Sequence, residues 1–173
     1  MRRIIALTIA VLVVGALHAW PVHASTDTWV RGGGTGTFGA DLDLDGDVDG
    51  SQFAFAVHIG ADSSARGRFV CLMAGRSDFL GLSLMSVNGP VSSGSIGPGS
   101  ATFAGTARIN LGGGEIIEGV AFEATVSPGG PGAGTLRLTV IGAFDGVAGD
   151  TIPGNGNYDL PVETVVSGRI SMS

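Results

Sequence analysis

Apolar residues alternate with polar or small residues along several short segments, and this period of two constrains the fold more than any other feature of the sequence. In the segment FAFAVHI the residues on one side of an extended chain are Phe53, Phe55, Val57 and Ile59. Similar alternation recurs in the segments 69–73, 80–84, 103–109, 120–126, 136–140 and 162–172. We therefore predict half-buried β-strands, in which each strand turns one face to a core.

The breaks between these segments are rich in Gly, Ser, Pro and Asp, the residues of tight turns. Residues 60–67 and Asn88-Gly89-Pro90 are predicted turns, and the Pro- and Gly-rich loop at 127–134 predicts a hairpin between its flanking strands. No apolar pattern of helical period follows residue 24. The prediction is an all-β fold, an antiparallel β-sandwich of about eight or nine short strands that forms a single domain over residues 25–173.

Residues 1–24 are typical of a cleaved secretory signal peptide. Met1-Arg2-Arg3 is a positive start, residues 4–17 are an apolar run that is short for a membrane span, and Val22-His23-Ala24 places small residues before a cut after Ala24. An uncleaved N-terminal anchor is the alternative. No later segment is apolar enough for an integral membrane span. We expect a secreted, extracellular or cell-surface protein, with the periplasm as the other destination.

The composition excludes several classes of chemistry. The 173-residue chain has a formal net charge of −6, and it contains no lysine. This charge balance argues against nucleic acid or an anionic membrane as a partner, since both need a basic patch. The absence of lysine excludes Schiff-base chemistry and a phosphate-loop lysine. With Cys71 as the one cysteine, no disulfide within the chain can form.

An aspartate-rich loop at residues 41–52 is the strongest candidate site in the sequence. Aspartate stands at every second position of DLDLDGDVDG, and hard Ca²⁺ takes six to eight oxygen ligands of this kind. The register of an EF-type loop places Gly46 at the sharp turn. The candidate metal ligands are Asp41, Asp43, Asp45, Asp47, Asp49 and Gln52. Because Gln52 stands where a bidentate Glu is expected, we predict weak binding, with Kd of roughly 10⁻⁴–10⁻³ M. A solvated acidic turn is the alternative.

Other motifs have ordinary structural interpretations. Residues 34–39 match G-x-G-x-x-G, but a nucleotide site needs a following helix, so a glycine-rich strand is favoured. Cys71 and His58 would point to opposite faces of a hairpin, which predicts a buried packing cysteine and no catalytic dyad. Glu115, Glu118 and Glu123 are expected at a solvated surface. The sequence thus predicts no catalytic residue.

Several of these segments together resemble the small secreted β domains called post-COAP domains, bacterial export modules found alone or after choice-of-anchor surface domains. The segments that carry the resemblance are GGGTGTFG, FAFAVHI with GRFVCLM, ATFAGTARINLGGG, VAFEATVSPGGPGAGTLRLTV and the final GRISM, and together they cover most of residues 29–172. The resemblance implies a β fold and a bacterial source, and it brings no catalytic residues. The aspartate-rich stretch at 41–49 replaces a short Gly-rich connection of the family pattern.

These observations lead to three functional hypotheses. The first is a non-enzymatic structural or interaction module of a bacterial surface or extracellular matrix, stabilised by Ca²⁺, whose unknown partner is a protein or glycan and which self-associates through its edge strands. The second is a Ca²⁺-dependent, lectin-like module that binds carbohydrate or protein through the aspartate-rich loop. The third, a hydrolase with paired carboxylates, is the weakest.

Overall fold

The computed structural model describes residues 27–42, 46, 48–73, 85–112 and 114–173. All regular structure in these residues is β-strand, as the sequence predicted. The predicted signal peptide at 1–24 and the predicted strand at 80–84 lie outside the described residues. The strands are β1 (Thr28–Thr37), β2 (Gln52–Ile59), β3 (Ser64–Leu72), β4 (Ser86–Gly97), β5 (Ser100–Asn110), β6 (Ile116–Ser127), β7 (Thr135–Ile141), β8 (Asn157–Asp159) and β9 (Glu163–Met172).

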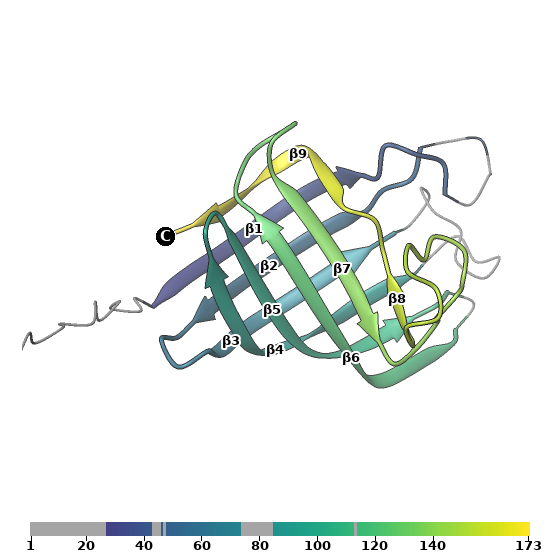
Figure 1. Ribbon diagram of the computed structural model, residues 1–173, viewed down its shortest axis with the longest axis horizontal. Coiled ribbons are helices and arrows are strands. Elements are labelled where there is room, and N and C mark those ends of the chain that lie inside the picture. Colours follow the sequence, from purple (N-terminus) through teal and green to yellow (C-terminus); the bar gives the residue numbers. More distant parts are fainter. Residues whose placement is uncertain (1–26, 43–45, 47, 74–84, 113) are drawn as a thin grey trace, which may run out of the picture.

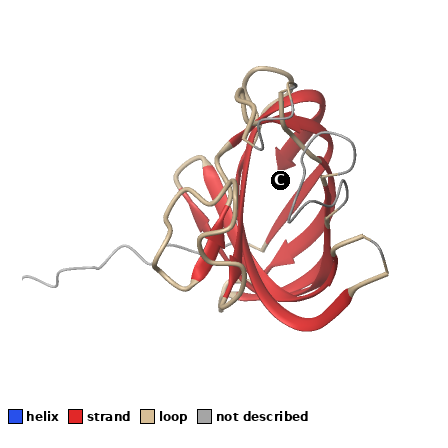
Figure 2. Ribbon diagram, turned by 90° about the vertical axis from the view of Figure 1, so that its right-hand side faces the viewer, coloured by secondary structure: helices blue, strands red, loops and turns tan. Residues whose placement is uncertain are grey.

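The nine strands form one antiparallel sheet that pairs back on itself. The order is β6-β5-β4-β3-β2-β1-β9-β7-β8, and β6 also pairs with β7, so eight strands make a closed ring to which the short β8 is attached (Figure 1). Seen from the side, the ring is flattened into two walls (Figure 2). The two layers that a sandwich would form as separate sheets are here the two walls of one continuous sheet.

The Pro- and Gly-rich loop at 127–134 completes the ring between β7 and β9. Direct pairing of these two strands is limited to Thr135 with Thr164 and Leu136 with Glu163. Beyond it, Gly129 exchanges two backbone hydrogen bonds of 2.9 and 2.8 Å with Ile170, and the Gly132 N–H donates to the Val165 carbonyl at 2.9 Å. This loop therefore covers the edge of β9. Among the described strands no long free edge remains for the predicted pairing of one molecule with another.

The core lies between the two walls and contains a chain of aromatic rings. Phe55 of β2 and Phe103 of β5 are 5.3 Å apart between ring centroids, and Phe69 of β3 and Phe122 of β6 are 5.2 Å apart. Because neither pair belongs to neighbouring strands, these contacts cross the interior. All four side chains are at most 6 % exposed. Such ring pairs add about 0.5–1.5 kcal/mol each to the free energy that burial supplies.

The predicted turn at Asn88-Gly89-Pro90 is wrong, because these residues lie within strand β4. Gly89 is opposite Phe69 of β3, and the chain continues beyond Pro90 to Gly97. A Cβ at Gly89 would lie 2.0 Å from the Thr106 carbonyl oxygen. Close approach of β5, followed by a register shift between Val91 and Ser93, is thus what requires glycine at this position.

At the start of β9, the side chains that face the core are not the ones that the sequence pattern predicted. Val162 and Val166 were expected to belong to its apolar face, but they are 53 % and 49 % exposed, while Val165 and Ile170 are buried. Val165 and Ile170 both face the core although they are five positions apart. Strict alternation would place residues an odd number of positions apart on opposite faces of the strand. The pairing with β1 shifts between Thr35 and Gly36, and this irregularity changes which side of β9 faces the core.

The described residues contain no helix, so they offer none that is long and apolar enough to cross a membrane.

Candidate functional site

The aspartate-rich loop joins β1 to β2, and its base is closed by backbone hydrogen bonds. The Phe38 N–H donates to the Asp49 carbonyl and the Asp49 N–H donates to the Ala40 carbonyl, both at 3.0 Å. The Asp41 carboxylate accepts the Gly46 N–H at 3.0 Å, and the Asp49 carboxylate accepts the Leu42 N–H. Two of the predicted metal ligands thus also organise the backbone of the loop.

The predicted ligands differ in their surroundings. Asp49 is fully buried, whereas Gln52 is the first residue of β2 and is exposed, opposite Thr35 on the outside of the sheet. Asp43, Asp45 and Asp47 lie outside the described residues. Within the residues that are described, no group of three His, Cys, Asp or Glu side chains is placed to hold a metal. Ca²⁺ binding by this loop therefore stays a prediction.

Beneath the loop, polar side chains are buried at the mouth of the closed sheet. Ser51 and Glu163 are 1 % and 2 % exposed, and the Ser51 hydroxyl donates to the Glu163 carboxylate at 2.7 Å. A Cβ at Gly36 would lie 2.2 Å from this carboxylate, so glycine provides the space for it. Burial and the charge of Glu163 raise the pKa of the nearby Cys71 thiol. Sequence reasoning missed Glu163 because the wrong face of its strand was assigned to the core.

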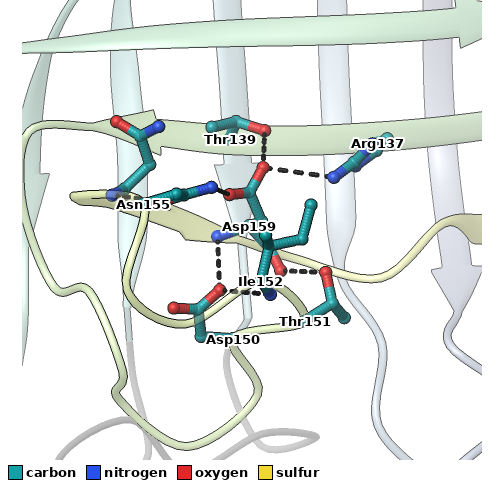
Figure 3. Close-up of polar contacts among 8 residues, drawn as sticks. Arg137, Thr139, Asp150, Thr151, Ile152, Asn155 and Asp159 are labelled. Atoms are coloured by element: carbon teal, nitrogen blue, oxygen red, sulfur yellow. Dashed lines mark hydrogen bonds and ion pairs between the residues drawn. The ribbon is translucent and has the colours of Figure 1, made fainter.

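A second acidic centre lies at the other side of the same end of the molecule, around Asp159 of β8. Its carboxylate accepts hydrogen bonds from Thr139 Oγ1 at 2.8 Å, Arg137 Nη2 at 3.1 Å and Asn155 Nδ2 at 2.6 Å (Figure 3). Thr139 is directly opposite Asp159 in the β7–β8 pairing. With a residue exposure of 5 %, Asp159 is a buried carboxylate with three donors, which suits a fixed acceptor rather than a proton donor.

The connection between β7 and β8, residues 142–156, is folded around two further aspartates. Asp150 accepts the N–H groups of Gly146 and Ile152 at 2.8 and 3.0 Å, and that of Asp159 at 3.2 Å. Asp145 accepts two more, from Gly154 and Gly156. Although desolvation acts to raise the pKa of Asp150, these N–H donors outweigh it and leave the pKa below its ordinary value. The connection is thus held in one conformation by hydrogen bonds to the carboxylates of Asp145 and Asp150.

This ordered connection borders a polar depression of about 280 Å³ on the outside of the sheet. Glu123 of β6, Thr139 of β7 and Asp159 of β8 lie in one row across the three strands. The depression is lined by Glu123, Thr125, Arg137, Thr139, Ile141, Asn157 and Asp159, and we call it the β6–β8 depression. It presents guanidinium, amide, hydroxyl and carboxylate groups beside the exposed Ile141. Such a lining offers both hydrogen-bond donors and acceptors.

Tyr158 lies between the 142–156 connection and the aspartate-rich loop. The Tyr158 hydroxyl donates to the Ala148 carbonyl at 2.9 Å. Burial raises the pKa of Tyr158, as do the negative charges of Asp150 and Asp49. A Cβ at Gly149 would also lie 3.9 Å from Leu42 of the aspartate-rich loop. The two loops therefore pack against one another around a buried phenol.

A separate depression of about 390 Å³ lies on the outside of β2 and β3, beside the start of β1. His58 Nε2 lies 3.5 Å from Asp27 Oδ2, and the His58 ring contacts Trp29 edge-on with 5.1 Å between centroids. The Arg31 guanidinium lies over the Trp29 ring at 4.6 Å. Trp29 is 38 % exposed, so the group presents an aromatic and cationic surface to solvent.

The weaker motifs have the structural roles that the sequence predicted. Cys71 is 1 % exposed and packs in the core, while His58 lies on the outer face with Trp29, so the two do not form a dyad. Gly34 lies within β1, which ends at Thr37 without a following helix. Glu118 pairs with Arg108 at 3.1 Å on the surface. Of the three glutamates considered, Glu123 lines the β6–β8 depression and Glu118 lines a separate depression beside Arg68 and Arg108.

Sequence reasoning did not find the β6–β8 depression. Its residues come from three segments whose pairing is set by the closure of the sheet, and Arg137 and Glu123 read only as the polar sides of alternating strands. The asparagines and glycines at 154–157 were a usable signal for an ordered turn. Comparison of the chain with protein-family models, curated proteins and solved structures found no match.

Proposed function

We propose that this chain is an exported, non-enzymatic interaction module of a bacterial surface or extracellular matrix, and that it contacts a carbohydrate through the β6–β8 depression. The observation that carries the proposal is the depression itself, in which side chains from three paired strands surround a space of about 280 Å³. That volume is close to the lower end of the range for small-molecule sites, roughly 300 Å³, and suits a single sugar ring.

The chemistry of the lining supports a sugar ligand. Arg137 donates one hydrogen bond to Asp159 and retains further N–H donors, while the Glu123 carboxylate supplies acceptors. Sugar hydroxyls are both donors and acceptors, and they need both kinds of partner. The exposed side chain of Ile141 adds an apolar surface for the C–H face of a ring. Because Arg137 and Asp159 are already fixed by hydrogen bonds, little side-chain entropy is lost on binding.

A non-enzymatic role agrees with the state of the carboxylates. Asp159 is occupied by three donors, and Asp145 and Asp150 accept backbone N–H groups. These carboxylates are engaged in holding the fold of the connection and of β8. The resemblance to post-COAP domains points the same way, since it brings no catalytic residues.

Ca²⁺ dependence is the second form of this proposal. The aspartate-rich loop packs on the 142–156 connection through Leu42 and Tyr158, and Asn155 and Asp150 of that connection form hydrogen bonds with Asp159, which lines the depression. An ion bound by the loop would offset the mutual repulsion of its aspartates, and so would stabilise the loop that packs on the 142–156 connection.

A glycan array with the purified mature chain tests both forms. We expect hits on neutral glycans that Arg137→Gln removes and that Ser95→Ala, at an exposed position of β4, retains. Hits that require Ca²⁺ would support the lectin-like form, and hits that persist in chelator would support the simpler module. An array without hits in either condition would refute carbohydrate binding.

A further inference from the structure

Among the described residues, most arginines are exposed on the outside of one contiguous run of strands. Five arginines are exposed on the outside of the contiguous strands β9, β1, β2, β3, β4 and β5. Arg137 is instead on β7, whose neighbour β6 faces β3 across the core. We call this outer surface the arginine face; it curves around the ring, since β5 lies across the core from β2, and its arginines are Arg31, Arg66, Arg68, Arg108 and Arg169.

Strand pairing arranges the arginine face in rows. Arg31 of β1 and Arg68 of β3 are both paired with Ala56 of β2, so they stand in one row two strands apart. That separation is roughly 9.5 Å between backbones. A second row runs from Arg169 to Arg108, and the residues between them are Gly33, Ala54, Val70 and Asn88. Small or short side chains therefore separate the guanidinium groups and leave the face open.

Two of these five guanidinium groups, those of Arg31 and Arg68, are oriented by a neighbour that does not neutralise their charge. Arg31 stacks on Trp29, and Arg68 Nε donates to Asn88 Oδ1 at 2.9 Å. In the described part of the chain, Arg108 is the one member of the face with a carboxylate within 4.0 Å, that of Glu118 at 3.1 Å. The other nearby acids, Asp27 and Asp62, are engaged by His58 and Ser64 at one end of the face.

The arginine face also contains a depression with polar side chains at its rim. A depression of about 300 Å³ lies between Arg68 and Arg108, above Gly89 and Pro90, whose small side chains leave the space. The Nε of each arginine is held by a neighbour, Asn88 or Glu118, so each planar group is fixed at the rim. Arg108 is paired with Glu118, which also lines the recess, whereas the Arg68 guanidinium is held at the rim without a carboxylate partner and retains N–H donors for an oxyanion.

We propose that the arginine face binds an acidic polysaccharide through its carboxylate or sulfate groups, as a second site distinct from the β6–β8 depression. Charge complementarity and rows across six strands favour an extended polyanion. A single strand of nucleic acid would need several aromatic platforms along its path, and within the described residues the aromatic rings of this face are confined to Trp29 and the adjoining His58. An anionic membrane would need an apolar rim, whereas the residues between the arginines are small.

Binding of the mature chain to immobilised alginate and dextran sulfate tests this proposal, with neutral dextran as the reference. We expect retention at low salt that weakens as salt is raised, because counterions are released on binding. The double variant Arg31→Gln/Arg68→Gln should bind at least tenfold more weakly. Retention on one of the two polymers alone would identify carboxylate or sulfate as the preferred group.

Arg137→Gln is the matched control, because it removes one charge from the opposite wall. It should leave polyanion binding within about twofold of wild type while abolishing the glycan-array hits. The two proposed sites can therefore be tested independently of one another. Thermal unfolding of each variant checks that the fold is intact. Absence of binding, equal loss with Arg137→Gln, or tighter binding to a single-stranded oligonucleotide or to anionic vesicles would overturn the proposal.

Discussion

The Ser51 hydroxyl and the Glu163 carboxylate form a 2.7 Å hydrogen bond inside the mouth of the closed sheet, where both residues are almost completely buried. The bond joins the chain just before β2 to the first residue of β9. Ser51→Ala would leave a buried carboxylate without this donor, and we expect a loss of about 1–3 kcal/mol in the free energy of unfolding. Urea unfolding measures it. Ser95→Ala, at an exposed position of β4, is the control and should change the free energy by no more than about 0.5 kcal/mol.

Asp159 should matter more for stability than the other acidic residue that lines the β6–β8 depression. Asp159→Ala removes the shared acceptor of Thr139, Arg137 and Asn155, and we expect a loss of about 2–3 kcal/mol in the free energy of unfolding. Glu123→Gln, on the exposed side of β6, should cost little. Equal effects of the two variants in urea unfolding would contradict the buried, fixed role of Asp159.

The connection between β7 and β8 should loosen in acid. Since the pKa of Asp150 is lowered in the folded chain, its contribution to stability is present above the unfolded value of about 3.9 and is lost as pH falls through the folded value. Limited proteolysis of residues 142–156 at pH 7 and at about pH 3 measures the change. Asp150→Asn should make cleavage at pH 7 faster. A connection that is as resistant at pH 3 as at pH 7 would argue against this role.

The Cys71 thiol should not react while the protein is folded. Burial and the charge of Glu163 raise its pKa, so the reactive thiolate is not formed at pH 8, and the core excludes the reagent. Titration with a disulfide reagent should show no labelling in buffer and one thiol in denaturant. Rapid labelling of the native protein would show that the mouth of the sheet opens.

Removal of Ca²⁺ should lower the thermal midpoint if the aspartate-rich loop holds an ion. We expect a higher midpoint in about 2 mM Ca²⁺ than in chelator, because an ion that binds only the folded state stabilises it. Asp45→Ala should abolish the difference, while Asp62→Ala, in the turn between β2 and β3, should preserve it. A wild-type midpoint that does not respond to Ca²⁺ would identify the loop as a solvated turn.

The sequence predictions succeeded where burial depends on the pattern within a single strand. The burial of Phe53, Phe55 and Val57 is encoded by alternation within β2, and the pattern needs no knowledge of neighbours. The predictions failed where a partner strand decides the outcome. Gly89 was assigned to a turn although the close approach of β5 is what requires glycine there, and β9 was given the wrong inward face because a register shift with β1 was not visible.

Side-chain alternation and turn residues act over a few positions, so the amino-acid pattern was enough to specify an all-β chain of about eight or nine strands with an apolar face on each. The tertiary structure alone decided that these strands close into one sheet, that Glu163 lies inside it, and that Arg31 and Arg68 stand in the same row on its outside. These relationships depend on register and closure between distant segments. A change of one residue in register turns a side chain from the core to solvent.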